Sequence, residues 1–280
     1  MITSERISVA EVSSHYDELD QFYREIWGNH VHHGLWTSGT ESVEEATRNL
    51  VEHMLAHVAL DSDSRVCDIG CGYGETARLI ASRKGASVTG FTVSEKQFLF
   101  AAARPMAKVS IRHGDWLVND LPDGSMDFAY SIESSEHMPS LERFFEQAHR
   151  VLAPGGTLAI YAWLENESAS EREKKWLLTP LCEEGRMRLY TRTEYDSLAE
   201  KVGFQSRSFD DVSAKVARTW TVCLRRLAAK LATDRRYQKF VLSPDAQNRD
   251  FAKTLLRIRL AYATGAMRYG LFLYSKPLRS

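Results

Sequence analysis

The hydrophobic pattern along the chain is helical at first and then breaks into short apolar runs. From Glu41 to Leu60, apolar residues recur every three or four positions, which predicts an amphipathic helix. Ser42 and Glu45 have the spacing of a capping box at the start of this helix. Beyond it, short apolar runs predict five strands. They lie at residues 65–69, 87–92, 110–113, 126–132 and 156–163.

Helical patterns alternate with these predicted strands. The predicted helices lie at residues 75–84, 94–103 and 141–152. Strands that alternate with helices are typical of a parallel sheet covered by helices on both faces. Because crossover connections are right-handed, the doubly wound arrangement is the expected topology. We therefore predict an α/β fold for the central part of the chain.

The alternation of strands and helices loosens after the fifth predicted strand. The elements expected there are a polar loop at 166–173, a helix at 193–202, a sixth strand at 204–212, a helical block at 213–264 and a last strand at 269–274. A helical block between two late strands is well placed to act as a lid. We therefore expect these helices to cover a pocket.

Composition and charge exclude several classes of protein. The 280 residues include 44% hydrophobic and 26% charged side chains, as in ordinary globular proteins. Lys and Arg total 36 and Asp and Glu total 37, so the chain lacks the basic excess of nucleic-acid-binding proteins. The largest local basic bias lies at 215–239, where we expect a solvated helix face. A groove for an acidic substrate is the alternative there.

Targeting signals and cysteine spacing favour a reducing compartment. The chain has no run of 18 apolar residues, so we expect no integral membrane segment. Residues 1–20 lack the apolar core of a signal peptide and are too acidic for a transit peptide, which favours a cytoplasmic location. The four cysteines match no paired zinc or disulfide spacing, so we expect free thiols.

A glycine cluster follows the first predicted strand. Gly70 and Gly72 stand between a strand and a helix, where a tight turn lets a ligand approach the backbone closely. Glu75 takes the place of the third glycine in the dinucleotide fingerprint, and no Gly-Lys-Ser/Thr follows for a P-loop. Asp68 can accept hydrogen bonds from a cationic amine, or else only cap the amides of the turn. The cluster therefore favours an adenosine cofactor other than a dinucleotide.

Several motifs carry a resemblance to one enzyme family. Residues 66–74, VCDIGCGYG, resemble the first motif of class I S-adenosylmethionine-dependent methyltransferases. Gly-Asp-Trp at 114–116 is similar to the turn of that family that binds adenine, and Pro-Gly-Gly at 154–156 is similar to its turn before the fifth strand. The resemblance implies S-adenosylmethionine as cofactor and methyl donor, with no metal required.

Other segments resemble one branch of that family. Thr92 stands where many members place an acidic ribose ligand, a variant typical of gamma-tocopherol and sterol methyltransferases, cyclopropane fatty acid synthases and sugar O-methyltransferases. Residues 27–36, WGNHVHHGLW, and 133–139, ESSEHMP, are similar to signatures of the tocopherol-type members. The family usually has Gly near Ser135, a departure that would alter the pocket wall.

The resemblance implies a division of the chain and a set of cofactor ligands. We expect a Rossmann-like, seven-stranded, mostly parallel sheet, with an N-terminal helical cap at 1–60, a cofactor-binding core at 61–165, and lid helices with the last strands at 166–280. The residues expected to bind the cofactor are Tyr16, Asp68, Gly70, Gly72, Thr92, Ser94, Gln97, Asp115 and Trp116.

The implied reaction is transfer of a methyl group from a sulfonium to a nucleophile by in-line displacement. For a hydroxyl acceptor, we expect His137 to be the general base because an ordinary histidine pKa of about 6.5 suits proton removal at neutral pH. Glu136 would orient His137 or act as the base itself. Glu133 would matter more in C-methylation, where a carboxylate stabilises a cation. The residues expected to line the acceptor pocket are His32, His33 and Trp36.

Three functions are weighed on these residues. The first is O-methylation of a small, hydrophobic or secondary-metabolite acceptor, and the second is C-methylation of a quinol or isoprenoid. The third is a non-catalytic sensor that binds the same cofactor. We expect a small-molecule partner and no nucleic acid, and a homo-oligomer is an open alternative. A metal site is not expected, because only His30 and His32 share a face in an extended segment and no carboxylate or cysteine stands beside them.

Overall fold

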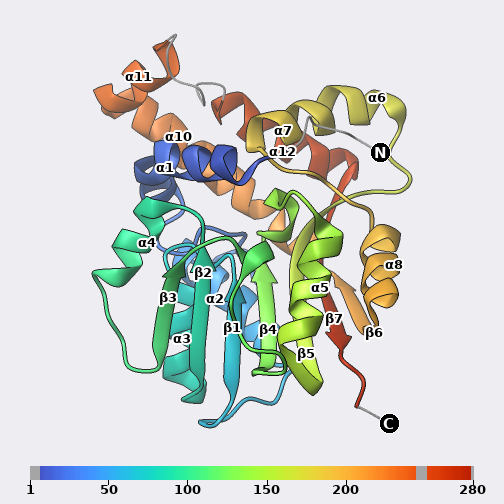
Figure 1. Ribbon diagram of the computed structural model, residues 1–280. Coiled ribbons are helices and arrows are strands. Elements are labelled where there is room, and N and C mark those ends of the chain that lie inside the picture. Colours follow the sequence, from blue (N-terminus) through green and yellow to red (C-terminus); the bar gives the residue numbers. More distant parts are fainter. Residues whose placement is uncertain (1–6, 244–250, 279–280) are drawn as a thin grey trace.

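The computed structural model describes residues 7–243 and 251–278, and its centre is a seven-stranded sheet (Figure 1). The strand order is β3-β2-β1-β4-β5-β7-β6, and only β7 runs antiparallel to its neighbours. The strands are β1 (Arg65–Ile69), β2 (Ser87–Thr92), β3 (Val109–His113), β4 (Met126–Ile132), β5 (Leu152–Glu165), β6 (Gln205–Asp211) and β7 (Met267–Ser275). The expected Rossmann-like, mostly parallel sheet is confirmed.

Most of the longer helices begin at a serine or threonine whose side chain accepts a backbone N–H of the first turn, as Ser8 does for α1 and Ser42 for α2. The helices are α1 (Val9–Ile26), α2 (Val43–Leu55), α3 (Glu75–Lys84), α4 (Glu95–Ala102), α5 (Leu141–Val151), α6 (Glu171–Glu173), α7 (Thr179–Gly185), α8 (Arg192–Val202), α9 (Ser213–Val216), α10 (Arg218–Thr233), α11 (Arg235–Leu242) and α12 (Phe251–Thr264). Short helical turns are η1 (Trp116–Val118), η2 (Ser135–His137) and η3 (Lys174–Leu178).

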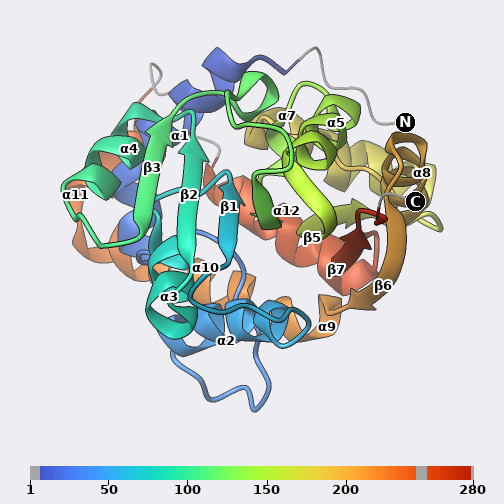
Figure 2. The same ribbon diagram turned by 60° about the horizontal axis from the view of Figure 1, so that its bottom comes forward.

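Helices cover both faces of the sheet, because successive strand residues point to opposite sides. In β4, Phe128 and Tyr130 pack into the cluster that includes α2 and α3, whereas Ala129 packs with α5 and α8. Figure 2 shows α2 and α3 on one side of the strands and α5 and α8 on the other. The sheet is therefore buried between two apolar layers, as a parallel sheet requires.

A third group of helices lies across the carboxyl end of the parallel strands. Figure 1 shows α1, α7, α10, α11 and α12 at this end, above the tips of β1 and β4. The insertion between β6 and β7, which the sequence predicts as a lid, supplies α9 to α12. Of the expected cap at 1–60, α1 lies at this edge, but α2 packs on the face of the sheet.

A few predicted elements need correction. The helix expected at 41–60 ends at Leu55, and the expected loop at 166–173 already contains α6. Helices α1 and α7 were not predicted. Part of the predicted helical block, 244–250, lies outside the described residues. The four cysteines are free thiols, and no described helix is long and apolar enough to cross a lipid bilayer.

Candidate active site

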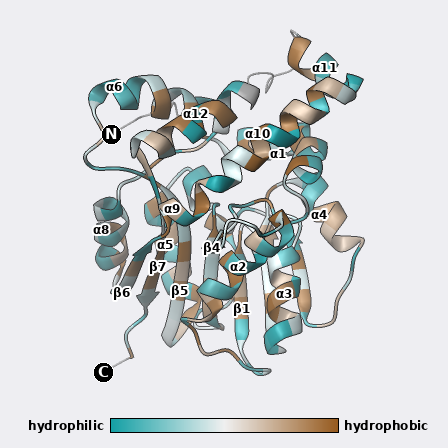
Figure 3. Cartoon of the chain, turned by 180° about the vertical axis from the view of Figure 1, so that it is seen from behind, coloured by the Kyte–Doolittle hydropathy of each residue, from teal (hydrophilic) through white to brown (hydrophobic). Residues whose placement is uncertain are grey.

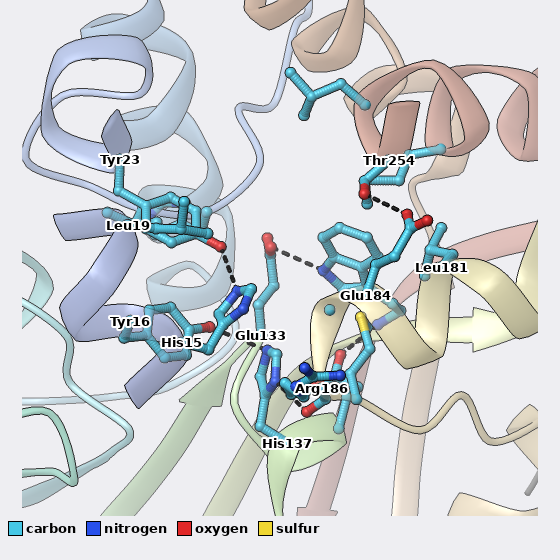
Figure 4. A pocket seen from close by; sticks show the side chains of 18 of the residues that line it. His15, Tyr16, Leu19, Tyr23, Glu133, His137, Leu181, Glu184, Arg186 and Thr254 are labelled. Carbon is cyan, nitrogen blue, oxygen red and sulfur yellow. Dashed lines mark hydrogen bonds between the residues drawn. The ribbon is translucent and has the colours of Figure 1, made fainter. Parts of the chain in front are cut away.

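Two pockets lie at the carboxyl end of the sheet and share a wall. The β1 pocket, a cavity of about 120 Å³, is lined by Asp68, Gly70, Gly72, Thr92, Gln97, Asp115 and Trp116 together with residues of α1 and β4. The lid pocket, a cavity of about 220 Å³, is enclosed by α1, α7, α10 and α12 (Figure 4). The residues that line both pockets are Tyr16, Val31, His32, Glu133 and His137.

The turn after β1 needs glycine at two positions for different reasons. Gly70 has φ +82°, and a Cβ there would lie 2.2 Å from the Cβ of Ser134. Gly72 has φ +52°, but a Cβ there would have no heavy atom within 4 Å among its described neighbours. Gly70 is therefore required by packing inside the protein, whereas Gly72 leaves open space for a ligand in the β1 pocket.

Replacing each glycine with alanine is expected to separate these two roles. Gly70→Ala should lower the free energy of unfolding by about 2–4 kcal/mol, because it adds overpacking to a left-handed backbone. Gly72→Ala should cost only about 1–2 kcal/mol of stability but weaken S-adenosylhomocysteine binding at least about tenfold. Thermal unfolding with and without S-adenosylhomocysteine measures both effects. Wild-type affinity in Gly72→Ala would place the cofactor outside the β1 pocket.

Four residues that line the β1 pocket carry a buried polar atom without a hydrogen-bond partner in the described part of the chain: Nε2 of His32, Oδ2 of Asp68, Nε1 of Trp116 and the hydroxyl of Tyr130. The Asp68 and Trp116 side chains are each only 2% exposed. Burial raises the pKa of Asp68 to about 7. A buried polar group without a partner is costly, so the Asp68 and Trp116 atoms fit a ligand that supplies the missing hydrogen bonds. An adenosyl cofactor with a cationic amine matches this requirement at Asp68.

The end of β2 contributes two of the three expected ligands there. Thr92 Oγ1 donates to Oε1 of Gln97 at 2.7 Å, and both side chains line the β1 pocket. Ser94 is fully buried outside this pocket. Its hydroxyl accepts the Gln97 N–H to cap α4 and donates to Asp17 of α1. The Ser94 side chain therefore joins α4 to α1, and Ser94 is not among the cofactor-binding residues that we propose on this geometry.

Asp115 and Trp116 follow β3 and lie at the far end of the β1 pocket. Oδ1 of Asp115 accepts the backbone N–H of Leu117 at 2.9 Å, which begins the turn η1. The Trp116 ring makes an edge contact with Phe91, with ring centroids 5.7 Å apart. Together these contacts present a carboxylate and an indole to one pocket, as the binding of a purine requires.

His137 stands on the shared wall, and its contacts define which ring nitrogen carries hydrogen. Nδ1 lies 3.0 Å from the carbonyl oxygen of Arg186, which can only accept, so Nδ1 is the donor. Burial lowers the pKa of His137, which keeps the ring neutral. Nε2 therefore holds a lone pair and accepts from the Tyr16 hydroxyl at 3.0 Å. Figure 4 shows Tyr16 on one side of His137 and Arg186 on the other.

Arg186 is a residue of the candidate site that the sequence did not indicate. It ends α7 in a left-handed conformation with φ +50°, which is uncommon for a residue other than glycine. The backbone carbonyl group of the same residue accepts the hydrogen bond that orients His137. A backbone contact across 49 residues has no signature in side-chain patterns. Only a three-dimensional structure could have identified this contact.

Glu133 is a buried carboxylate surrounded by hydrogen-bond donors. Its Oε1 accepts from the backbone N–H of His33 at 2.7 Å, from His33 Nδ1 at 2.9 Å and from the Tyr269 hydroxyl at 2.8 Å. Its Oε2 accepts from the Trp163 indole at 2.8 Å. Burial alone would raise the pKa of Glu133, but the contacts with His33 outweigh it and hold the pKa at about 2. Glu133 therefore favours the ionised form at neutral pH, which gives the shared wall a negative charge.

Glu136 lines only the lid pocket and behaves in the opposite way. Burial raises its pKa to about 8, although Oε1 accepts the Trp163 N–H at 2.6 Å and Oε2 lies 3.1 Å from the Ser135 hydroxyl. Glu136 is thus a neutral acid at pH 7. The prediction that it orients His137 is wrong, because both ring nitrogens of His137 have other partners.

His32 is on the shared wall as expected, but the other two predicted pocket residues are not. His33 is 1% exposed, and its Nε2 accepts the Trp220 indole N–H at 2.7 Å. Trp36 donates to Thr219 at 3.0 Å in a separate small cluster. Neither lines the β1 pocket or the lid pocket, so they are not among the residues that we propose for the acceptor.

The histidine segment does not form a metal centre in the described part of the chain. The rings of His30 and His32 lie 5.2 Å apart, on one face as expected. Among the described residues, however, no three His, Cys, Asp or Glu side chains are placed to hold one metal ion. The site is therefore built from histidine, tyrosine and carboxylate side chains at the junction of two pockets.

Comparisons with known proteins show the family and the fold of the chain. Residues 3–243 match the family described as mycolic acid cyclopropane synthetase. The 27-O-demethylrifamycin SV methyltransferase of Amycolatopsis mediterranei is 31% identical over 221 residues, which cover 77% of this chain and 81% of that protein. The chloroplastic tocopherol O-methyltransferase of Arabidopsis thaliana is 29% identical over 290 residues, which cover 95% of this chain and 82% of that protein.

A solved structure shows the same fold. The cyclopropane synthase MmaA2 from Mycobacterium tuberculosis superposes with a TM-score of 0.83 at 19% sequence identity, over 98% of this chain and all of that chain. The family match covers more than half of the chain, and the rifamycin relative is matched over more than two thirds of its length. The chain therefore belongs to the mycolic acid cyclopropane synthetase family and is an S-adenosylmethionine-dependent methyltransferase of small molecules.

Proposed function

We propose that the enzyme methylates a hydroxyl oxygen of a largely hydrophobic small molecule held in the lid pocket, with His137 as the base. The observation that carries this proposal is the lone pair on Nε2 of His137, on the wall between the two pockets. When bound, S-adenosylmethionine supplies the methyl group. The cofactor-binding residues that we propose on this geometry are Tyr16, Asp68, Gly70, Gly72, Thr92, Gln97, Asp115 and Trp116.

A proton can leave the acceptor hydroxyl by way of Tyr16. An acceptor that donates to the Tyr16 oxygen passes its proton through that hydroxyl to Nε2 of His137, because Tyr16 already donates there. Burial raises the pKa of Tyr16 well above its ordinary value, so Tyr16 stays protonated and acts as a relay. An acceptor that displaces Tyr16 would donate to Nε2 directly. Either route places a neutral imidazole where general base catalysis needs it.

His32 offers a second bare nitrogen on the same wall. Its Nδ1 lies 2.8 Å from the carbonyl oxygen of His33 and must donate to it. Burial lowers the pKa of His32, and its buried Nε2 has no partner among the described residues. An unpartnered acceptor at this place calls for a donor from a ligand. We propose that the acceptor hydroxyl binds here as well, which keeps His32 as a substrate-binding residue.

The lining of the lid pocket supports a hydrophobic acceptor. Apolar and aromatic side chains from α1, α7, α10 and α12 face the cavity, as is usual for small-molecule pockets. They are Leu19, Trp27, Leu181, Met187, Trp220, Leu255 and Ile258. The names of the rifamycin and tocopherol relatives indicate oxygen acceptors in those proteins, which supports the same atom type here.

C-methylation is the second candidate because of Glu133. Methyl transfer to an alkene leaves a carbocation on the acceptor, and an ionised carboxylate beside it stabilises that charge. Glu133 stays ionised and lines both pockets, so it is placed for this role. The two candidates use different residues of one wall and are separated by the position of the transferred methyl group.

The deciding experiment is transfer from S-adenosylmethionine with an isotopically labelled methyl group to a panel of phenols, quinols, glycosides, prenyl diphosphates and unsaturated fatty acids. Mass spectrometry locates the label. We expect the label on oxygen of a hydrophobic acceptor. Label on carbon would favour the Glu133 candidate. Stabilisation by S-adenosylhomocysteine without any methylated product would favour a cofactor-binding sensor instead.

A further inference from the structure

The lid helices carry an excess of positive charge that the reaction does not use. Residues 213–264 contain twelve basic and three acidic side chains, although the net charge of the whole chain is −1. Some of these cations form ion pairs with Glu25, Glu44 or Glu184. Besides Lys215 and Arg218 near the start of this segment, four exposed cations have no carboxylate partner in the described part of the chain, namely Arg225, Arg235, Lys239 and Arg259.

Exposed leucines stand beside these cations. Leu242 is 80% exposed, Leu256 is 52% exposed and Leu260 is 44% exposed. On α11 the spacing of Arg235, Lys239 and Leu242 is i, i+4 and i+7, which is one face of a helix. On α12, Leu256 and Leu260 are one turn apart and flank Arg259. We name these seven residues the outer lid surface: Arg225, Arg235, Lys239, Leu242, Leu256, Arg259 and Leu260.

The outer lid surface lies on the same helices that line the lid pocket. Leu255 and Ile258 of α12 face the pocket, whereas Leu256 and Leu260 face outward. Arg259 Nε donates to Thr221 of α10 at 3.0 Å, which joins the outer sides of the two helices. Figures 1 and 3 both show α10, α11 and α12 together at one end of the molecule. A contact at this end therefore lies next to the acceptor pocket.

We propose that the outer lid surface docks on an anionic lipid bilayer, from which the enzyme takes a lipid-soluble acceptor. Arginine and lysine side chains attract anionic headgroups, and exposed leucines between them can enter the headgroup region. Nucleic acid would use the cations but would leave the leucines in water. The docking deepens the proposed function, because a hydrophobic acceptor concentrates in a membrane and reaches the pocket through the lid helices.

Vesicle co-sedimentation of the full chain tests the docking without acceptor or cofactor. We expect the protein to bind vesicles of phosphatidylcholine and phosphatidylglycerol, to bind phosphatidylcholine alone much less, and to dissociate at high salt. The double variant Arg235→Glu/Lys239→Glu should lose at least about tenfold in vesicle affinity, given the contribution of each cation near an anionic surface. The double variant Leu256→Ser/Leu260→Ser should also weaken binding, with less dependence on salt.

A matched control variant tests whether a loss of vesicle binding comes from this surface or from the change in net charge alone. Arg83→Glu/Arg207→Glu changes the net charge equally on exposed residues of α3 and β6 and should bind vesicles as the wild type does. No vesicle binding by the wild type, or equal losses in the control, would overturn the docking, as would a preference for RNA over vesicles. Methylation of a detergent-dispersed acceptor by all these variants would show that the proposed function stands independently of the docking.

Discussion

Replacing His137 with asparagine is expected to lower kcat by about 10²–10⁴, the usual contribution of a general base, while S-adenosylhomocysteine affinity changes little. Asparagine is a sharp substitution here because its amide N–H can take the place of Nδ1 and still donate to the Arg186 carbonyl. It removes only Nε2, the atom that accepts from Tyr16. Single-turnover methyl transfer and calorimetric binding of S-adenosylhomocysteine measure the two quantities separately.

His32→Asn is the matched control for this prediction. His32 also donates Nδ1 to a backbone carbonyl and also keeps a bare Nε2, but that nitrogen has no tyrosine partner. As a residue that binds the acceptor, His32 should affect mainly KM when it is replaced. If His32→Asn loses the larger part of kcat and His137→Asn keeps it, the base is His32. Full activity in both variants would contradict O-methylation with a histidine base.

The pH profile gives a further check on His137. Burial lowers its pKa below the ordinary histidine value of about 6.5, so the lone pair on Nε2 is present throughout the neutral range. Protonation at lower pH removes that lone pair. The kcat of the wild type should therefore stay level near neutrality and fall only below about pH 6.5, and His137→Asn should lack this fall. A fall that begins above that pH would contradict a buried neutral base.

Much of the fold could be predicted because the strands are short, apolar and separated by regular helices. β1, β2 and β4 lie where the pattern placed them, since a strand buried on both faces must be apolar along its length. Helix α1 was missed although Ser8 and Glu11 form a capping box at its start. In this segment only Tyr16 was singled out from the sequence, as a cofactor ligand, whereas the buried Val12 and Leu19 show the helical spacing that would have identified the helix.

The part of the candidate site near the glycine turn after β1 could be predicted from the sequence. Asp68, Gly72 and Trp116 line one pocket because parallel strands end at one edge. Ser94 shows the limit of this reasoning, since the serine that caps a helix and the serine that faces a ligand have the same sequence context. The aromatic segment at 27–36 poses a similar problem, because Val31 and His32 line both pockets whereas the neighbouring His33 is buried in the protein interior.

The contacts of Glu133 could not be predicted from the sequence because they come from three separate segments of the chain. Donors reach it from the loop before α2, from β5 and from β7. Each of those donors is an unremarkable aromatic or histidine residue in its own segment. Only the tertiary structure brings these donors together around one carboxylate. Because all of them need an acceptor, the stability of the protein should depend strongly on the ionised form of Glu133.

Replacing Glu133 with glutamine is therefore expected to have the second large effect, a loss of about 1–3 kcal/mol for each buried donor left without an acceptor. The amide group of glutamine must present an N–H to at least one of the donors from His33, Trp163 and Tyr269. Methyl transfer should fall as well, because the negative charge on the wall is lost. Urea unfolding and single-turnover transfer measure the two effects.

Glu136→Gln is the matched control. The stability contributed by Glu133 and the stability contributed by Glu136 should change with pH in opposite directions. The pKa of Glu133 is depressed to about 2, so its stabilisation is present above the ordinary value of about 4.3 and is lost as pH falls toward 2. The pKa of Glu136 is raised to about 8, so its stabilisation is full below about pH 4.3 and is lost as pH rises through 8.

The wild type should thus exceed Glu133→Gln at neutral pH, with a gap that narrows in acid. Glu136→Gln imitates a neutral acid, so it should match the wild type below about pH 4.3, become progressively more stable than the wild type as pH rises from there to about 8, and keep that advantage at higher pH. Urea unfolding of both variants across this range decides the matter. Equal losses of unfolding free energy in the two variants at every pH would mean that neither carboxyl group has the charge state derived from its contacts. The inference that Glu133 gives the shared wall a negative charge would then be wrong.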